Sequence, residues 1–255
     1  INIGFRPDLI WLKSRGSGNH GLYDSVRGPD KRLQSDSTAV EGTVVFPGAS
    51  DFGFDFGSET YYNGSSTNYV AWTWKAGGNK NTFNVDDVGH ASAAAAGITE
   101  GTNALTGASV GTKQGFSITK HAVSGASVPY TVGHGLSEAP TFIIWKSLSS
   151  SNWVVYHAST GNQSRTYLNL TNTASSGEAY LNNTSPSSSV TTMGSSGEFT
   201  GDMIMYSWHD VPGLQKFGTY QGNGSTDGPF IELGFRPAVI LWKKTSEASD
   251  ASWML

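Results

Sequence analysis

The chain contains no cysteine, and only 14% of its 255 residues are charged. Without thiols it forms neither disulfides nor thiolate metal sites. It also lacks a run of Lys and Arg, which a nucleic-acid groove requires, and its net charge is −4. No stretch approaches the roughly 20 apolar residues of a membrane-spanning helix. These absences argue against nucleic-acid partners and against membrane insertion.

Aromatic and small polar residues are abundant instead. Trp, Tyr and Phe together make 12% of the chain, and glycine occurs 32 times. Each buried aromatic side chain removes about 150–250 Å² from water, so the chain has enough apolar bulk for sizeable cores. Hydroxyl and amide groups, rather than charges, keep such a surface soluble. This balance is typical of secreted β-proteins, bacterial surface proteins and virus fibres.

One short pattern occurs three times in the chain. It consists of a proline, one further residue, four apolar residues and a lysine, and it begins at Pro7, Pro140 and Pro237. A short apolar run behind a proline predicts a buried strand. Further strands follow the first two copies at equal spacing, so we interpret the copies as duplicated repeats. The predicted strands are 20–24 and 152–157, followed by closing strands 69–75 and 203–209.

The repeats divide the chain into four predicted segments. The first repeat, which lacks its N-terminal hairpin, is 1–77, and a linker rich in Gly, Ala and Asn follows at 78–113. The second repeat is 114–212, and a truncated start of a third is 213–255. We also predict front hairpins at 115–135 and 216–234 and a short helix at 91–96. We interpret the sequence as an excerpt from an array, whose third copy needs a partner because its core is small.

Helical periodicity is nearly absent, and turn residues recur about every ten positions. Short strands with such spacing predict an all-β protein. We expect tandem β-sandwiches of the jelly-roll or lectin-like type. The central run 142–145 is apolar throughout, which predicts that both of its faces are covered.

Long stretches of the chain resemble a repeat found in large virion and tail-fibre-like proteins of marine bacteriophages. They are GFRPDLIWLKSR (4–15), NYVAWTWKAGG (68–78), NVDDVGHASAAAAGIT (84–99) and KFGTYQGNGSTDGPFIELGFRPAVILWKK (216–244). The resemblance implies an extracellular place in the virion, other virion subunits or copies of the chain as partners, and contact with host-surface glycans. It supplies no catalytic residues. The second copy has GLSEAP in place of GFRP, so it lacks a counterpart of Arg6 and Arg236.

We find no pattern that predicts catalysis. The six histidines show no metal-ligand spacing, and the nucleophile pattern G-x-S-x-G is missing. Two carboxylate pairs could serve glycoside cleavage, Asp51 with Asp55 and Asp86 with Asp87, and the second pair could instead bind Ca²⁺ in a loop. We favour structural roles for both pairs. We therefore predict that the chain is not an enzyme and holds no cofactor or metal.

The stretch ETYYNGSSTNY at 59–69 is the most suggestive surface segment. Adjacent tyrosines in an extended chain point to opposite sides, so one of the two is exposed. Sugars bind to an aromatic face together with amide groups, which makes four residues candidate glycan contacts: Tyr61, Tyr62, Asn63 and Asn68. The competing interpretation is a plain hairpin turn with one tyrosine in the core.

Three functions remain open from the sequence. The first is a structural virion protein that mediates adhesion to host glycans or to other virion proteins. The second is a stand-alone carbohydrate-binding protein. The third is a polysaccharide-degrading tailspike-type enzyme, which requires two carboxylates about 5–10 Å apart in a groove.

Overall fold

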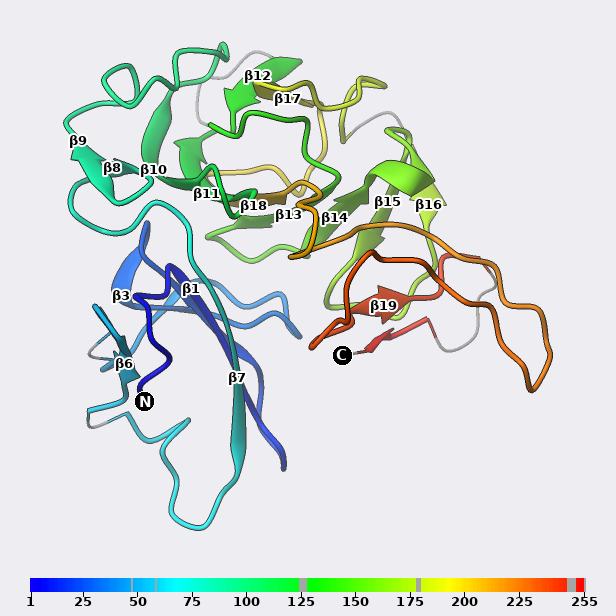
Figure 1. Ribbon diagram of the computed structural model, residues 1–255. Helices are drawn as coiled ribbons and strands as arrows, with labels where there is room; N and C mark the ends of the chain where they lie inside the picture. The colour runs from blue at the N-terminus through cyan, green and yellow to red at the C-terminus, as the bar shows by residue number, and fades with distance from the viewer. Residues whose placement is uncertain (47, 58, 124–127, 178–179, 247–250, 255) are drawn as a thin grey trace.

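The chain folds almost entirely into β-structure, as a computed structural model shows (Figure 1). The structure describes residues 1–46, 48–57, 59–123, 128–177, 180–246 and 251–254. Within these ranges the one helical element is a single 3₁₀ turn, η1 (Ala158–Thr160). No helix in the described part of the chain is long and apolar enough to cross a membrane. The all-β prediction is confirmed.

Two sheets form the body of the molecule. The five-stranded sheet has the order β4 (Gly42–Thr43), β3 (Gly28–Leu33), β2 (Gly21–Asp24), β1 (Leu9–Ser14) and β7 (Tyr69–Trp74). The nine-stranded sheet has the order β16 (Ser175–Ser176), β15 (Ser164–Tyr167), β14 (Val154–His157), β13 (Phe142–Ser147), β18 (Asp202–Trp208), β11 (Phe116–Ala122), β10 (Leu105–Gly111), β8 (Phe83–Val85) and β9 (Val88–His90). Neighbouring strands are antiparallel except β8 and β10, which are parallel.

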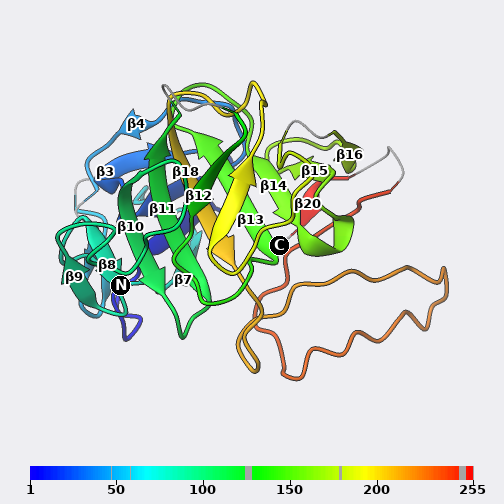
Figure 2. The same cartoon turned by 90° about the horizontal axis from the view of Figure 1, so that it is seen from above.

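Three two-stranded sheets complete the fold. They are β5 (Gly48–Ser50) with β6 (Gly53–Asp55), β12 (Tyr130–Gly133) with β17 (Val190–Met193), and β19 (Trp242–Lys243) with β20 (Trp253–Met254). The first two cover the outer faces of the large sheets, and the third lies near the edge of the nine-stranded sheet, beside β15 (Figures 1 and 2).

The two large sheets pack face to face around one shared apolar core. In β1, Leu9 and Trp11 point into this core, whereas Ile10 points to the opposite face. In β13, Phe142 and Ile144 point into the same core. Because successive side chains of a strand alternate between its faces, each central strand needs a cover on both sides. The small sheets β5–β6 and β12–β17 supply the outer covers, as expected for uninterrupted apolar runs.

Two three-stranded units pair in the same register. In the first unit, β2-β1-β7, Ile10 lies opposite Tyr23. In the second unit, β14-β13-β18, Ile143 lies opposite Tyr156, so both positions are shifted by 133 residues. The pairing of β1 with β7 matches that of β13 with β18, with one additional residue in the second unit. The units thus have equivalent strands in equivalent places.

The lysine that ends each of the first two runs has a structural role. Lys13 Nζ donates to the backbone oxygens of Ser14 and Gly16, at 2.7 and 3.2 Å. Lys146 Nζ donates to the corresponding oxygens of Ser147 and Ser149, at 2.6 and 2.7 Å. The lysine side chain folds back and satisfies the carbonyl groups of the turn that follows its strand. Burial lowers the pKa of Lys146 to about 8.

Segment 78–113, predicted to be a linker, is part of the nine-stranded sheet. It contributes β8, β9 and β10, and the predicted helix at 91–96 is a turn without regular helix. Small side chains misled the prediction: Ala108 and Ser109 are fully buried, because their size lets the strand pack closely against its neighbours. The Gly- and Ala-rich composition of segment 78–113, which is typical of a linker, here belongs in part to a tightly packed strand.

The predicted front hairpins are also wrong. β11 pairs with β10 and β18, whereas β12 pairs with β17 in a different sheet. The two runs of segment 115–135 therefore lie in two layers rather than in one hairpin. Segment 216–234 contains no strand at all. Two β-like runs around a turn predict proximity along the chain but do not determine whether the runs share a sheet.

The C-terminal segment packs on the second unit, as its small size required. Phe217 stacks on Phe142, with ring centroids 5.3 Å apart. Trp253 Nε1 donates to Tyr167 O at 2.8 Å. The corresponding bond joins the second unit to the first, where Trp153 Nε1 donates to Gln34 O at 2.8 Å.

A second backbone contact recurs with this indole bond. Glu41 N donates to Leu148 O at 2.9 Å, and Ala174 N donates to Thr245 O at 3.1 Å. Each of the two contacts occurs twice, and the residue on the earlier unit differs by 133 positions between the two occurrences. Gln34 corresponds to Tyr167, and Glu41 corresponds to Ala174. The β19–β20 hairpin therefore sits on the second unit as the second unit sits on the first.

We predict that Trp153→Phe lowers the free energy of unfolding by about 1–3 kcal/mol, because the buried indole no longer donates to the half-buried carbonyl oxygens of Gln34 and Ser37, and Gln34 O keeps only the longer bond from Ser37 N at 3.3 Å. Trp253→Phe is the matched control, since its ring is half-buried and it donates to one carbonyl. Urea unfolding measures both. Equal stability of Trp153→Phe and the unchanged protein contradicts the assignment.

Acid is predicted to destabilise the fold through two buried histidines. Burial lowers the pKa of His121 and of His134 to about 4, below the usual 6.5. His134 Nδ1 accepts from Leu136 N, a bond that a protonated ring loses. The unfolded chain binds these protons first, so stability falls from about pH 6.5 to about pH 4, by up to about 3 kcal/mol for each group. Urea unfolding at several pH values measures the slope, and His121→Leu should remove part of it.

Candidate binding surface

The structure separates the two tyrosines of the candidate glycan surface. Tyr61 is 63% exposed, whereas Tyr62 is 3% exposed and lies in the core beneath β5–β6. Tyr62 packs edge-on against Tyr23, with ring centroids 6.2 Å apart, and its hydroxyl donates to Asn19 O at 3.3 Å. Burial raises the pKa of Tyr62 to about 12. Tyr62 thus offers no ring face to a ligand, and its place in the predicted site is corrected to a core position.

The exposed tyrosine has a cation on one face. The Arg32 guanidinium carbon lies 4.3 Å from the Tyr61 ring centroid, a cation–π distance. The backbone N–H of Tyr61 donates to Glu59 Oε1 at 2.5 Å, which fixes the turn before the ring. Glu59 itself is 4% exposed. The ring therefore lies at the surface with the Arg32 guanidinium over one face, and this arginine was not singled out in the sequence.

The two predicted asparagines remain at the surface. Asn63 and Asn68 are both exposed, and Asn68 O accepts from Arg15 N at 2.9 Å. The turn between them is fixed by Gly64 N, which donates to the hydroxyl of Tyr69 at 3.0 Å. The structure therefore leaves three of the four predicted residues, Tyr61, Asn63 and Asn68, accessible to a ligand.

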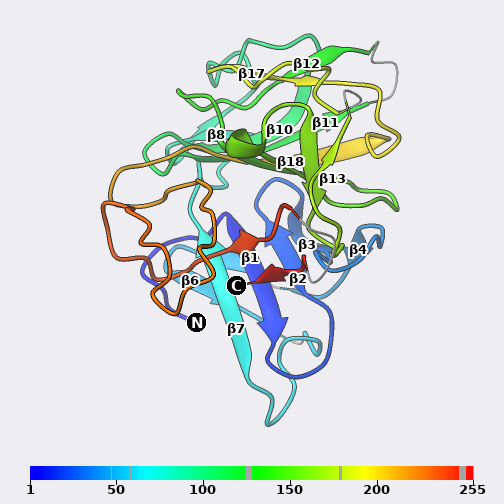
Figure 3. The ribbon, with the colours of Figure 1, turned by 90° about the vertical axis from the view of Figure 1, so that its right-hand side faces the viewer.

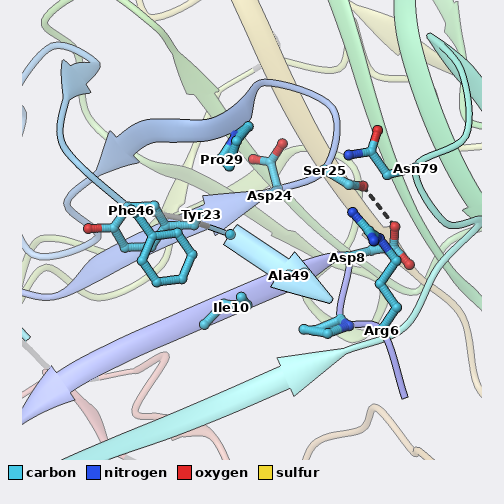
Figure 4. A pocket seen from close by; sticks show the side chains of 12 residues that line it. Arg6, Asp8, Ile10, Tyr23, Asp24, Ser25, Pro29, Phe46, Ala49 and Asn79 are labelled. Carbon is cyan, nitrogen blue, oxygen red and sulfur yellow. Dashed lines mark hydrogen bonds between the residues drawn. The ribbon is translucent and has the colours of Figure 1, made fainter. Parts of the chain in front are cut away.

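A small cavity lies where β1, β2 and β5 meet (Figure 4). Its volume is about 80 Å³, far below the roughly 300–1,000 Å³ of pockets that hold small-molecule ligands. The side chains that line it include Arg6, Asp8, Tyr23 and Asn79, as Figure 4 shows. The cavity has room for a few water molecules but not for a sugar ring.

The carboxylate at this cavity is structural. Asp8 is 1% exposed, and its Oδ1 accepts from Ser25 Oγ at 2.8 Å and from Ser109 Oγ at 3.0 Å. Its Oδ2 accepts from Ala76 N at 2.7 Å and from Gly78 N at 3.2 Å. Four donors satisfy the buried charge and tie together three distant parts of the chain. An acid with all its acceptor sites occupied in this way is a structural cross-link, not a catalyst.

A second buried charge joins the two large sheets. Arg27 Nε donates to Asp24 Oδ2 at 2.6 Å, and Tyr206 OH on β18 donates to the same oxygen at 2.7 Å. Glu41 Oε1 lies 3.2 Å from Arg27 Nη1. A buried pair persists only when its remaining donors and acceptors find partners, and here they do. The cluster therefore sets the position of the first unit on the second.

The other carboxylate pairs also have structural roles. Asp86 and Asp87 form the turn between β8 and β9, both with positive φ, as that hairpin turn requires. Asp86 Oδ1 accepts from Thr112 N at 2.9 Å, and Asp87 pairs with Lys75 at 2.7 Å. In the described part of the chain no three His, Cys, Asp or Glu side chains lie close enough to hold a metal ion.

The first pair lies beside the turn between β5 and β6. Asp55 Oδ1 accepts from Gly57 N at 2.8 Å, and Asp51 lies 3.8 Å from Arg6. Phe52, beside them, is 68% exposed, whereas Phe54, which shares its face in the alternating stretch DFGFDFG (51–57), is 2% exposed. The strand begins only at Gly53, so the alternation does not extend to residue 52.

Sequence comparison identifies the family without assigning an activity. No curated protein and no solved structure matches the chain. The model of one family, a domain of unknown function (DUF7483), matches residues 1–255. This match leaves the resemblance to virion proteins a prediction. Because the match covers the whole sequence, the chain belongs to the DUF7483 domain family.

Proposed function

We propose that the chain is a structural module of a bacteriophage virion appendage, such as a tail fibre. Its tandem repeats of the jelly-roll or lectin-like type associate through one recurring contact. In this role the module lies outside the cell, in the virion, and contacts other virion subunits and host-surface glycans. The proposal needs no catalytic group, no cofactor and no metal.

The recurring contact is the observation that carries the proposal. The indole of Trp153 binds a carbonyl of the first unit, and the indole of Trp253 binds the equivalent carbonyl of the second. A contact that repeats in one direction, with different surfaces on its two sides, builds extended or ring-like assemblies. Such a contact suits a structural array.

The shared core supports the same proposal. It takes side chains from both units and from the C-terminal segment, including Trp11, Ile144 and Leu241, which occupy the same position in the three copies of the run. Each copy therefore completes the core of its neighbour. Modules that fold only against each other form a continuous body, which suits a load-bearing appendage.

Mass spectrometry of purified particles tests the proposal. The protein is expected in particles that remain after washing and density-gradient purification, at a constant ratio to the major capsid protein. The soluble fraction of lysed host cells is the control. Detection in that fraction alone, with none in the particles, contradicts the structural assignment.

Glycan binding is a second candidate, and one observation favours it. Tyr61 presents an exposed ring with Arg32 behind it, flanked by the exposed amides of Asn63 and Asn68. A sugar ring that stacks on the free face of Tyr61 finds hydrogen-bonding groups at its rim. This surface provides adhesion, and weak sites gain avidity when many copies are present.

We predict that Tyr61→Ala weakens binding of the chain to host-surface polysaccharide at least about tenfold, the equivalent of about 1.4 kcal/mol. Phe52→Ala is the matched control, because Phe52 is another exposed aromatic residue, 68% accessible, outside this surface. Saturation-transfer NMR with the purified polysaccharide measures the contact. Unchanged transfer in Tyr61→Ala, or equal loss in both variants, contradicts the glycan surface.

A further inference from the structure

The outer edge of β7 is free. β7 ends the five-stranded sheet, and no strand of the described residues lies beyond it. Arg15 N donates to Asn68 O, and ladder bonds alternate along an antiparallel pair. The backbone groups of Tyr69, Ala71 and Thr73 therefore point away from β1. β7 carries no charged residue and no proline, which are the usual devices that keep an edge from pairing.

The equivalent edge in the second unit is occupied. Leu148 N donates to Asp202 O at 2.8 Å, which matches the bond from Arg15 to Asn68 in the first unit. On β18, the backbone groups of the alternate residues Met203, Met205 and Ser207 point toward β11. β11 pairs with β18 along its whole length. The structure thus contains its own example of a strand added to this edge.

A segment equivalent to the added strand is present but unused. We call residues 218–238 the arm. The arm follows Phe217, contains no strand, and projects from the body as a long loop (Figure 2). Most of the arm lies in segment 216–234, the sequence counterpart of segment 115–135, which provides β11 and β12. Tyr220, Phe230 and Ile231 on the arm are 55%, 88% and 44% exposed.

The arm does not reach its own β7. Its first end is held by Phe217, whose N–H donates to Asp210 Oδ1 at 2.9 Å, and its second end leads into β19. Both ends lie beside the second unit, and the arm extends away from β7 (Figures 1 and 2). Figure 3 shows β7 in the layer beneath the nine-stranded sheet, beside β1.

We propose that the arm of a second copy of this chain adds as a strand to the outer edge of β7. The added strand takes the place on β7 that β11 has on β18. Main-chain hydrogen bonds to Tyr69, Ala71 and Thr73 supply the contact, and the exposed aromatic and aliphatic side chains of the arm become buried. Donor and acceptor are different surfaces, so copies join head to tail. Only the biological use of this contact rests on the proposed structural role, and the contact itself does not.

Light scattering after size-exclusion chromatography tests the contact through Ala71→Pro. Proline removes only an N–H that points to the free edge, and an edge strand tolerates it there. The unchanged protein and Ala71→Ser are expected to rise in mean mass with concentration, while Ala71→Pro stays at the mass of one chain. A single-chain mass for the unchanged protein up to about 1 mM overturns the proposal. Association of a folded Ala71→Pro equal to that of Ala71→Ser also overturns it.

Mixing two variants gives a second, independent test. Phe230→Ser with Ile231→Ser removes the donor, whereas Ala71→Pro removes the acceptor, and each variant alone is expected to stay monomeric. Their mixture retains one intact edge and one intact arm, so it should form a two-chain species. Val88→Ser, on an exposed apolar residue outside the arm, is the control and should associate normally. No two-chain species from two folded variants overturns the proposal, even if virus particles contain the protein.

Discussion

The fold depends on the burial of one face of each large sheet against the other. Leu9 and Trp11 on β1 meet Phe142 and Ile144 on β13 in a core that neither unit completes alone. Because the opposite faces are apolar too, each central strand is covered twice, and the molecule becomes a stack of layers. The charged cluster of Asp24 and Arg27 then sets the relative position of the sheets through Tyr206. Apolar area supplies the stability, and the polar contacts select one arrangement.

Much of this architecture was predictable, because strand pattern and repeat spacing are local signals. The runs after Pro7 and Pro140 became central strands with matching neighbours, and an uninterrupted apolar run correctly predicted two covered faces. Layer assignment was not predictable, since a strand pattern does not state which sheet a strand joins. For this reason β11 and β12 were wrongly expected to form a hairpin. Strand β10, rich in Gly, Ala and Ser, was missed because buried small residues resemble a linker in composition.

The candidate surface was predicted in part. The pair Tyr61 and Tyr62 correctly signalled one exposed and one buried ring, but the sequence could not determine which. Burial of Tyr62 follows from its contact with Tyr23, and Asn19 O accepts from its hydroxyl. Arg32 was missed, because it lies far from Tyr61 in sequence and no local pattern connects them. Long-range placement of a side chain follows from sheet packing, which the sequence does not reveal.

The position of Asp8 has a mechanical consequence. Its carboxylate binds Ser25, Ser109 and the backbone after β7, and it lies immediately before β1, which is paired on both edges. Tension applied along β1 must therefore shear two ladders and this cross-link together, rather than open hydrogen bonds one after another. Shear loading distributes force over many bonds at once, so the N-terminal strand resists extension far better than its short length suggests.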